Sequence, residues 1–262
     1  MQERCLLIAL VVLFVVGVLA GLSRAEIDPN SIVGVWLLDE GEGNTAKDSS
    51  ENGHNGEIKG NVKWVEGEFG KALEFPGIVG SYVDIPDEEG LNLVTWSITV
   101  WLKIKQVNGE FHAVIKEQPG NTRNYGVIVE PGFAYPTFTA GAAVWKNVAG
   151  RTVVADDEWH HVAATYDKTS EKLYVDGALD VQASFTDDPD TPAGPLGIGA
   201  GGVGGTVGPV AGVLDEVAVF NVALAEEDVN NIMNDGLAVA LGITAVSPLS
   251  KLSTAWGKLK AK

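Results

Sequence analysis

The alternation of apolar and polar residues with a period of two constrains the fold of this chain more than any other feature. The segment WSITVWLKI places Trp96, Ile98, Val100, Leu102 and Ile104 on one face, and Ser97, Thr99, Trp101 and Lys103 on the other. Successive side chains of a β-strand leave on opposite faces, so this pattern predicts a strand with one buried face. Similar short segments, including FHAVIK, YGVIVE, EWHHVAATY and GVLDEVAVF, recur between clusters of glycine, asparagine, aspartate and proline. Such a series predicts an all-β sandwich or jelly roll.

One segment has the period of a helix instead. ALAEEDVNNIMNDG begins with acidic residues and places on one stripe Ala225, Val229, Ile232 and Met233. Acidic side chains stabilise the first turn of a helix, and a glycine, here Gly236, is typical just past its end. We therefore expect one short C-terminal helix, followed by a tail of residues 237–262 that is first apolar and then basic.

The first 25 residues have the pattern of a secretory signal peptide. Arg4 precedes an apolar run from Leu6 to Leu22, and Ser23 and Ala25 supply the small residues of a cleavage site. An uncleaved membrane anchor is the alternative, because the run is long enough to span a bilayer. The only cysteine, Cys5, would leave with the signal, so the mature chain would have no disulfide and no thiol nucleophile. We expect a protein that is secreted or held at the cell surface.

The charge balance excludes some partners. The chain has 35 acidic and 18 basic residues, a net charge of −17. Such a surface repels nucleic acid and anionic lipid. It is compatible with calcium and with neutral or cationic ligands, although a well-solvated exported surface explains the same charge.

Two neighbouring histidines, in DDEWHHVAATYDKTSEKLYVDG, suggest a site but fit a scaffold better. On a strand His160 and His161 leave on opposite faces, so they cannot bind one metal together. We interpret the segment as one strand followed by a hairpin. GAGGVG, residues 199–204, has the spacing of a dinucleotide fingerprint, but no helix follows it to hold a phosphate, so it is expected to be a loop.

Catalytic motifs are missing from the sequence. It contains no G-x-S-x-G nucleophile motif. Glycoside hydrolysis needs two carboxylates that face one cleft. On a regular strand Asp215 and Glu216 would face apart, and Asp156 and Glu158 lie in a turn. The sequence therefore predicts a protein that is not an enzyme.

Three aspartates raise the question of a structural calcium ion. Asp215 lies among apolar residues, and a buried charge needs a partner. Asp48 lies in the loop KDSSENGHNG, and Asp39 ends the first predicted strand. Their oxygens suit calcium, but a network of Asx turns explains the loop equally well.

Several segments occur in the order typical of a known family. They are IVGVWLLDEGEGNTAKDSSENGHNGEI, GEFGKALEFPGIVGSYVDIPD, LNLVTWSITVWLKI, EWHHVAATYDKTSEKLYVDG and GVLDEVAVFNVALAEEDV. Over residues 32–236 the chain resembles a laminin G-like domain of the concanavalin A-like lectin/glucanase superfamily. The resemblance implies a two-sheet jelly roll with adjacent first and last strands, which would bring Asp39 and Asp48 toward Asp215. Calcium sites are common in the family, whereas the E-x-D-x-E strand of its glucanases is absent here.

The superfamily holds lectins, adhesion modules and glycosidases, so the resemblance constrains function less than fold. We expect a non-catalytic binding or adhesion module that recognises a glycan or another extracellular polymer. The alternatives are a diverged glycoside hydrolase or lyase, and a purely structural cell-surface protein. Aromatic residues of the middle segment are the candidates for stacking on sugar rings, with Trp145 first, followed by Tyr125, Phe133 and Tyr135.

Overall fold

The structure is a computed structural model that describes residues 27–105, 109–118, 120, 122–141 and 143–243. The predicted signal peptide, residues 1–25, lies outside the described residues, and so does most of the predicted tail.

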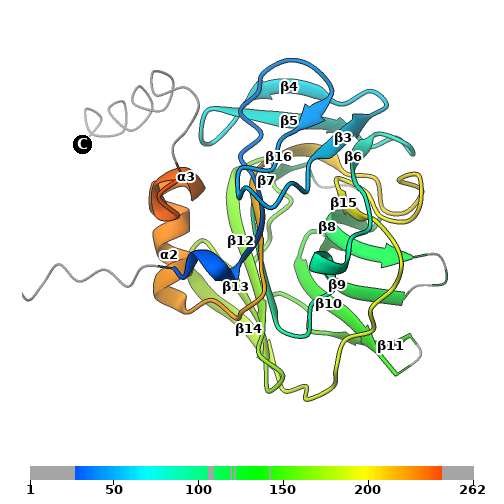
Figure 1. The fold of residues 1–262 in the computed structure, drawn as a ribbon, viewed down its shortest axis with the longest axis vertical. Helices are drawn as coiled ribbons and strands as arrows, with labels where there is room; N and C mark the ends of the chain where they lie inside the picture. The colour runs from blue at the N-terminus through cyan, green and yellow to red at the C-terminus, as the bar shows by residue number, and fades with distance from the viewer. Residues whose placement is uncertain (1–26, 106–108, 119, 121, 142, 244–262) are drawn as a thin grey trace, which may run out of the picture.

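The described residues form two antiparallel sheets of eight strands each (Figure 1). The first sheet contains, in spatial order, β14 (Ala178–Ala183), β13 (Glu171–Val175), β12 (His160–Tyr166), β7 (Trp96–Ile104), β16 (Ala211–Phe220), β5 (Lys71–Pro76) and β4 (Lys63–Glu66), with β1 (Ile32–Trp36) also paired to β16. The second contains β11 (Val144–Asn147), β10 (Ala134–Ala140), β9 (Thr122–Val129), β8 (Phe111–Gln118), β15 (Leu196–Ile198), β6 (Tyr82–Ile85), β3 (Gly56–Lys59) and β2 (Thr45–Ala46). Short 3-10 turns lie at η1 (Pro29–Ser31) and η2 (Glu89–Leu91). The predicted sandwich is confirmed, and so is the adjacency of its first and last strands, β1 and β16.

The core lies between the two sheets. The predicted apolar face of β7 points into it, and each of Trp96, Ile98, Val100, Leu102 and Ile104 is buried there. Alternate residues of β12 join the same core, whereas Ala163 packs on the opposite face of the sheet. The period of two thus sorts the side chains of these strands between the core and the outer face, as predicted.

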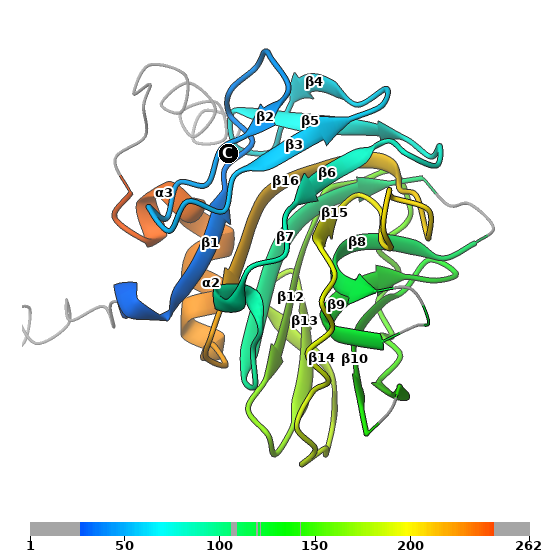
Figure 2. The same ribbon diagram turned by 45° about the vertical axis from the view of Figure 1, so that its right-hand side comes forward.

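Two helices cover the outer face of the first sheet, on the side away from the second sheet (Figure 2). Helix α2 (Glu226–Asp235) is the predicted one, and it packs through Val229 and Ile232. Gly236, with φ 75°, ends it in a conformation that favours glycine. The chain then turns into α3 (Leu237–Ala240), where the sequence predicted only a tail, because Leu237 joins the same apolar cluster. Among the described residues, no helix is long and apolar enough to cross a membrane.

A β-bulge in β16 overturns one prediction from strict alternation. The register shifts between Asp215 and Ala218, and Glu216 has φ 48°. Asp215 pairs with Trp101 on the outer face, and Glu216 also turns outward, where it accepts a hydrogen bond from Leu237 N at the start of α3. The expectation that the two carboxylates face apart was therefore wrong, because a bulge adds one residue to the alternation.

Glu171 is a buried carboxyl at the start of β13. Neither carboxyl oxygen has a hydrogen-bond partner among the described residues, and burial raises the pKa of Glu171 well above its ordinary value. The folded protein therefore holds this proton at pH values where the unfolded chain has released it, and stability falls as pH rises between the two pKa values.

We expect Glu171→Gln to stabilise the protein at pH 7 and to change little at pH 4, because glutamine is neutral in both states. The gain should grow by about 1.4 kcal/mol for each pH unit between the two pKa values. Denaturant unfolding of both proteins from pH 4 to pH 8 measures it. A constant difference across this range would mean that Glu171 stays ionised in the fold.

Candidate functional site

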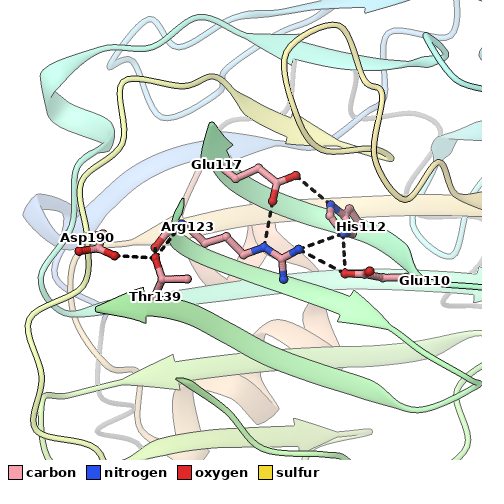
Figure 3. Close-up of polar contacts among 6 residues, drawn as sticks. All are labelled: Glu110, His112, Glu117, Arg123, Thr139 and Asp190. Carbon is pink, nitrogen blue, oxygen red and sulfur yellow. Dashed lines mark hydrogen bonds and ion pairs between the residues drawn. The ribbon is translucent and has the colours of Figure 1, made fainter. Parts of the chain in front are cut away.

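Four charged side chains form a closed ring on the outer face of the second sheet (Figure 3). His112 Nδ1 lies 3.1 Å from Glu117 Oε1, and His112 Nε2 lies 2.8 Å from Glu110 Oε1. Arg123 donates from Nε to Glu117 Oε2 at 2.9 Å and from Nη2 to Glu110 Oε1 at 3.3 Å. We call these four residues the charged ring.

Two irregularities in the pairing of β8 with β9 bring the charged ring together. His112 and Glu117 are five residues apart, so strict alternation would send them to opposite faces. A register shift between His112 and Val114 corrects this difference, and a second one, between Lys116 and Glu117, sets Arg123 opposite Glu117. Residues Phe111, Ala113, Val114 and Tyr125 of the same strands remain in the core. The charges thus occupy the outer face while the apolar contacts are kept.

The charged ring sets its own protonation states. Burial by itself lowers the pKa of His112, but hydrogen bonds to Glu110 and Glu117 outweigh burial and raise it. The hydrogen bond from His112 holds the pKa of Glu110 below its ordinary value. Burial raises the pKa of Glu117, yet His112 and Arg123 together lower it. Both carboxylates are therefore ionised at neutral pH.

Trp145 lies directly over the charged ring. The guanidinium carbon of Arg123 is 4.1 Å from the centre of the indole. Strand β11 presents Trp145 on this face because it pairs with Thr139 of β10, whose neighbours Phe138 and Ala140 point into the core. Arg123 is 1% exposed, whereas Trp145 is 43% exposed and is the one exposed aromatic side chain among the described residues. One face of the indole is therefore occupied, and its exposed surface lies on the opposite face and the edge.

The glycine-rich segment 199–210 covers the other side of the charged ring. It is a loop, as predicted, and β16 follows it instead of a helix. A Cβ atom at Gly201 would overlap Glu117 Oε1 and His112 Nδ1, and one at Gly208 would overlap the His112 ring. Glycine is therefore required here so that the backbone can lie against these side chains.

The four predicted aromatics do not form one surface. Tyr125 was the wrong choice, because it is fully buried in the core, where its ring lies 6.2 Å from that of Trp96. Tyr135 is half-buried on β10, on the same face as Thr139, and Phe133 is half-buried beside Val153. Only Trp145 among the four combines exposure with a contact to the charged ring.

Asp48 accepts hydrogen bonds from its own loop and from β1. Its Oδ1 accepts hydrogen bonds from Val35 N, Ser50 N and Ser50 Oγ, and its Oδ2 accepts one from His54 N. These donors match the Asx-turn interpretation of the loop.

Asp39 and Asp215 do lie near each other, against the turn at residues 67–71. Asp39 Oδ1 accepts from Lys71 N, and Asp215 Oδ2 accepts from Phe69 N, both at 2.9 Å. Burial, followed by the charges of Glu216 and Asp39, raises the pKa of Asp215 well above its ordinary value. Across the described residues, no three His, Cys, Asp or Glu side chains are placed to hold one metal ion. Among the described residues the three predicted aspartates therefore do not form one metal-binding group.

The two neighbouring histidines have separate surroundings, as predicted. His160 Nδ1 lies 2.8 Å from Asp176 Oδ2, and His160 Nε2 lies 3.2 Å from Asp156 Oδ1. His161 is buried against Trp101, and burial lowers its pKa to about 3, so it is neutral.

Sequence reasoning missed Glu110, His112, Glu117 and Arg123. The spacing of Glu110 and His112, two residues apart at the start of a predicted strand, was an available signal. Through Arg123, the charged ring can hold the neighbouring indole of Trp145 in place. Its two carboxylates are both ionised, so this pair lacks the protonated carboxyl that glycoside hydrolysis needs.

The sequence matches a laminin G family model, described as the concanavalin A-like lectin/glucanases superfamily, over residues 77–230. The chain belongs to the concanavalin A-like lectin/glucanases superfamily. The matched residues include β7 to β10, and with them the charged ring and Trp145. No curated protein matches the chain.

Several solved structures share this fold, and two of the three described here are named as binding domains. The binding domain of Paraclostridial Mosquitocidal Protein 1 has a TM-score of 0.65 and 17% identity, over 79% of this chain and 52% of that one. The receptor binding domain of botulinum neurotoxin C/D mosaic serotype has a TM-score of 0.61 and 12% identity, over 78% and 51%. Domain 4 of AbnA, an extracellular arabinanase from Geobacillus stearothermophilus in complex with arabinotriose, has a TM-score of 0.62 and 20% identity, over 78% and 98%. This chain thus spans about half the length of the toxin domains and nearly all of the arabinanase domain.

Calcium binding stays a prediction, now limited to Asp39 and Asp215. We expect calcium to raise the melting temperature, since an ion that binds only the folded state adds about 2.7 kcal/mol at a hundredfold excess over its Kd. Asp215→Asn should remove most of this rise, whereas Glu74→Gln, an exposed acid on the adjacent strand β5, should retain it. A melting curve that chelator leaves unmoved in the unmodified protein would end the calcium hypothesis.

Proposed function

We propose that this protein is an exported, non-catalytic binding domain that takes a neutral glycan on the outer face of the second sheet. The observation that carries the proposal is Trp145, an exposed indole whose inner face rests on a buried arginine. Sugar rings present apolar C–H faces, and a rigid aromatic plane offers them a large contact area at a low entropic cost. In this domain Trp145 stacks on one sugar ring.

The charges of the site favour a neutral ligand. The charged ring combines Glu110 and Glu117 with Arg123 and a protonated His112, so its charges cancel while His112 keeps its proton. The whole chain has a net charge of −17, which repels sulfated or sialylated glycans. Glu110 is 30% exposed, and its carboxylate can accept hydrogen bonds from sugar hydroxyls.

The similar structures support a binding role. One of them holds arabinotriose, a neutral oligosaccharide, and the toxin domains are binding or receptor binding domains. By the same proposal the protein acts outside the cell or at its surface, after removal of residues 1–25, and its partner is a glycan or another extracellular polymer.

A diverged glycoside hydrolase or lyase is the alternative function, and a purely structural cell-surface role is a third. We expect purified protein to release no reducing sugar from any polysaccharide that it binds, because Glu110 and Glu117 are both held ionised. A reducing-sugar assay over hours at pH 5 and pH 7 measures this. Release that disappears in Glu110→Gln or in Glu117→Gln would establish the enzyme instead.

We expect Trp145→Ala to weaken binding at least about tenfold, a loss of about 1.4 kcal/mol, because the stacking plane is removed. Trp145→Phe should retain part of the affinity. A glycan array run with and without calcium identifies ligands, and calorimetry on the strongest of them gives Kd. Val144→Ala is the matched control, since Val144 is an exposed neighbour whose side chain leaves on the opposite face of β11. Equal binding of every array ligand by Trp145→Ala and the unmodified protein would place the site elsewhere.

A further inference from the structure

We propose that Arg123 is a positioning residue, which fixes the plane of the Trp145 indole so that its outer face is ready for a sugar ring. This inference rests on the proposed function, because it concerns the affinity of the same site. Arg123 itself does not touch the ligand in this arrangement, since it lies 1% exposed beneath the indole.

Strand β11 alone holds Trp145 weakly. The strand has four residues, lies at the edge of the second sheet and, within the described part of the chain, pairs only with β10. Nothing in that pairing selects one rotamer for an exposed side chain. The contact that does so is the stack on the Arg123 guanidinium, whose centre lies 4.1 Å from the ring.

The guanidinium can support the indole because hydrogen bonds at two of its edges fix its own plane. Its Nε donates to Glu117 Oε2 at 2.9 Å, and its Nη2 donates to Glu110 Oε1 at 3.3 Å. Two hydrogen bonds from one planar fork define a plane, whereas the ammonium of a lysine would supply only a point charge. The chemistry of arginine is therefore required at this position, and not only its charge.

His112 completes the charged ring by contacting the carboxylates of Glu110 and Glu117. Both of its ring nitrogens face carboxylate oxygens, so both must carry a proton for the two contacts to be hydrogen bonds. The charged groups that face His112 are Glu110, Glu117 and Arg123. The glycine-rich loop covers its remaining side with the backbone of Gly201 and Gly208. Loss of the His112 proton would turn one of these contacts into a repulsion between two lone pairs and would loosen that carboxylate.

A fixed indole raises affinity because little side-chain freedom is lost when the ligand binds. Three measurable properties should therefore depend on Arg123: the affinity for the glycan, the mobility of the indole and the pH dependence of binding.

The first experiment compares Arg123→Met with Arg123→Lys. We expect both variants to weaken glycan binding by about tenfold, because neither side chain has a planar group on which the indole can stack. Lys146→Met is the matched control. It removes a cation from β11, the strand that carries Trp145, where Lys146 faces Phe185 and Asp187 instead of Trp145. If Arg123→Met does not fold, Glu117→Gln, which weakens the bond to Nε, replaces it.

The second measurement follows Trp145 without any ligand. In protein labelled with 5-fluorotryptophan, the ¹⁹F signal that disappears in Trp145→Phe belongs to Trp145. We expect this signal to shift and broaden in the Arg123 variants and to remain in place in Lys146→Met. An unchanged Trp145 signal in Arg123→Met would overturn the inference.

The pH dependence supplies the third measurement. Because the folded-state pKa of His112 is raised, the charged ring is complete below that pKa and is lost as pH rises through it. Affinity should therefore fall as pH rises through this range, and His112→Gln should abolish the dependence. A profile that is the same with and without His112 would contradict this step.

Failure of the inference is distinguishable from failure of the proposed function. Loss of binding in Trp145→Ala together with normal binding in Arg123→Met would keep the site and overturn the role of Arg123. Absence of any array ligand for the unmodified protein would overturn the proposed function, while the ¹⁹F signal would still report whether Arg123 fixes the indole.

Discussion

The apolar layer between the two sheets limits where every polar group of this protein can lie. Alternate residues of β7, β8, β9, β10 and β12 fill that layer. A charge placed among them would lose its hydration, so charged side chains must lie on the outer faces or receive partners. The outer face of the first sheet is itself covered by α2 and α3. The outer face of the second sheet is where the chain gathers its charged ring and its exposed tryptophan.

β-bulges make this arrangement compatible with the core. A regular strand offers each face every second residue, and His112 and Glu117 do not fit that spacing. The irregularities of β8 and β9 bring them to one face and turn Arg123 toward them. A bulge in β16 likewise sends Asp215 and Glu216 to the same side. In both sheets, the extra residue gathers charges that alternation would separate.

The proposed function assigns the charged ring to holding a ligand rather than to reacting with it. Its carboxylates are kept ionised by Arg123 and His112, and their hydrogen bonds go to fixing the guanidinium beneath Trp145. Under the further inference, recognition by an indole plane that is already in place costs little side-chain entropy, which favours binding of an uncharged ligand such as a neutral glycan. The same fold carries binding and catalysis in other proteins, so these side chains, and not the fold, are the basis of the proposed role.

Strand alternation, the helix signal and the loop character of the glycine-rich segment could all be predicted from the sequence, because each is a local property of consecutive residues. WSITVWLKI became β7 with its expected core face, and EEDVNNIMND became α2. Trp145 was predicted as a ligand contact, and the structure leaves it exposed, whereas Tyr125 occupies the core. The charged ring and the backbone partners of Asp39 and Asp215 were decided only by tertiary structure. The charged ring depends on bulges, and a bulge depends on how a strand pairs with its partner. The contact of Asp215 with Phe69 joins residues far apart in the sequence, so no local pattern predicts it.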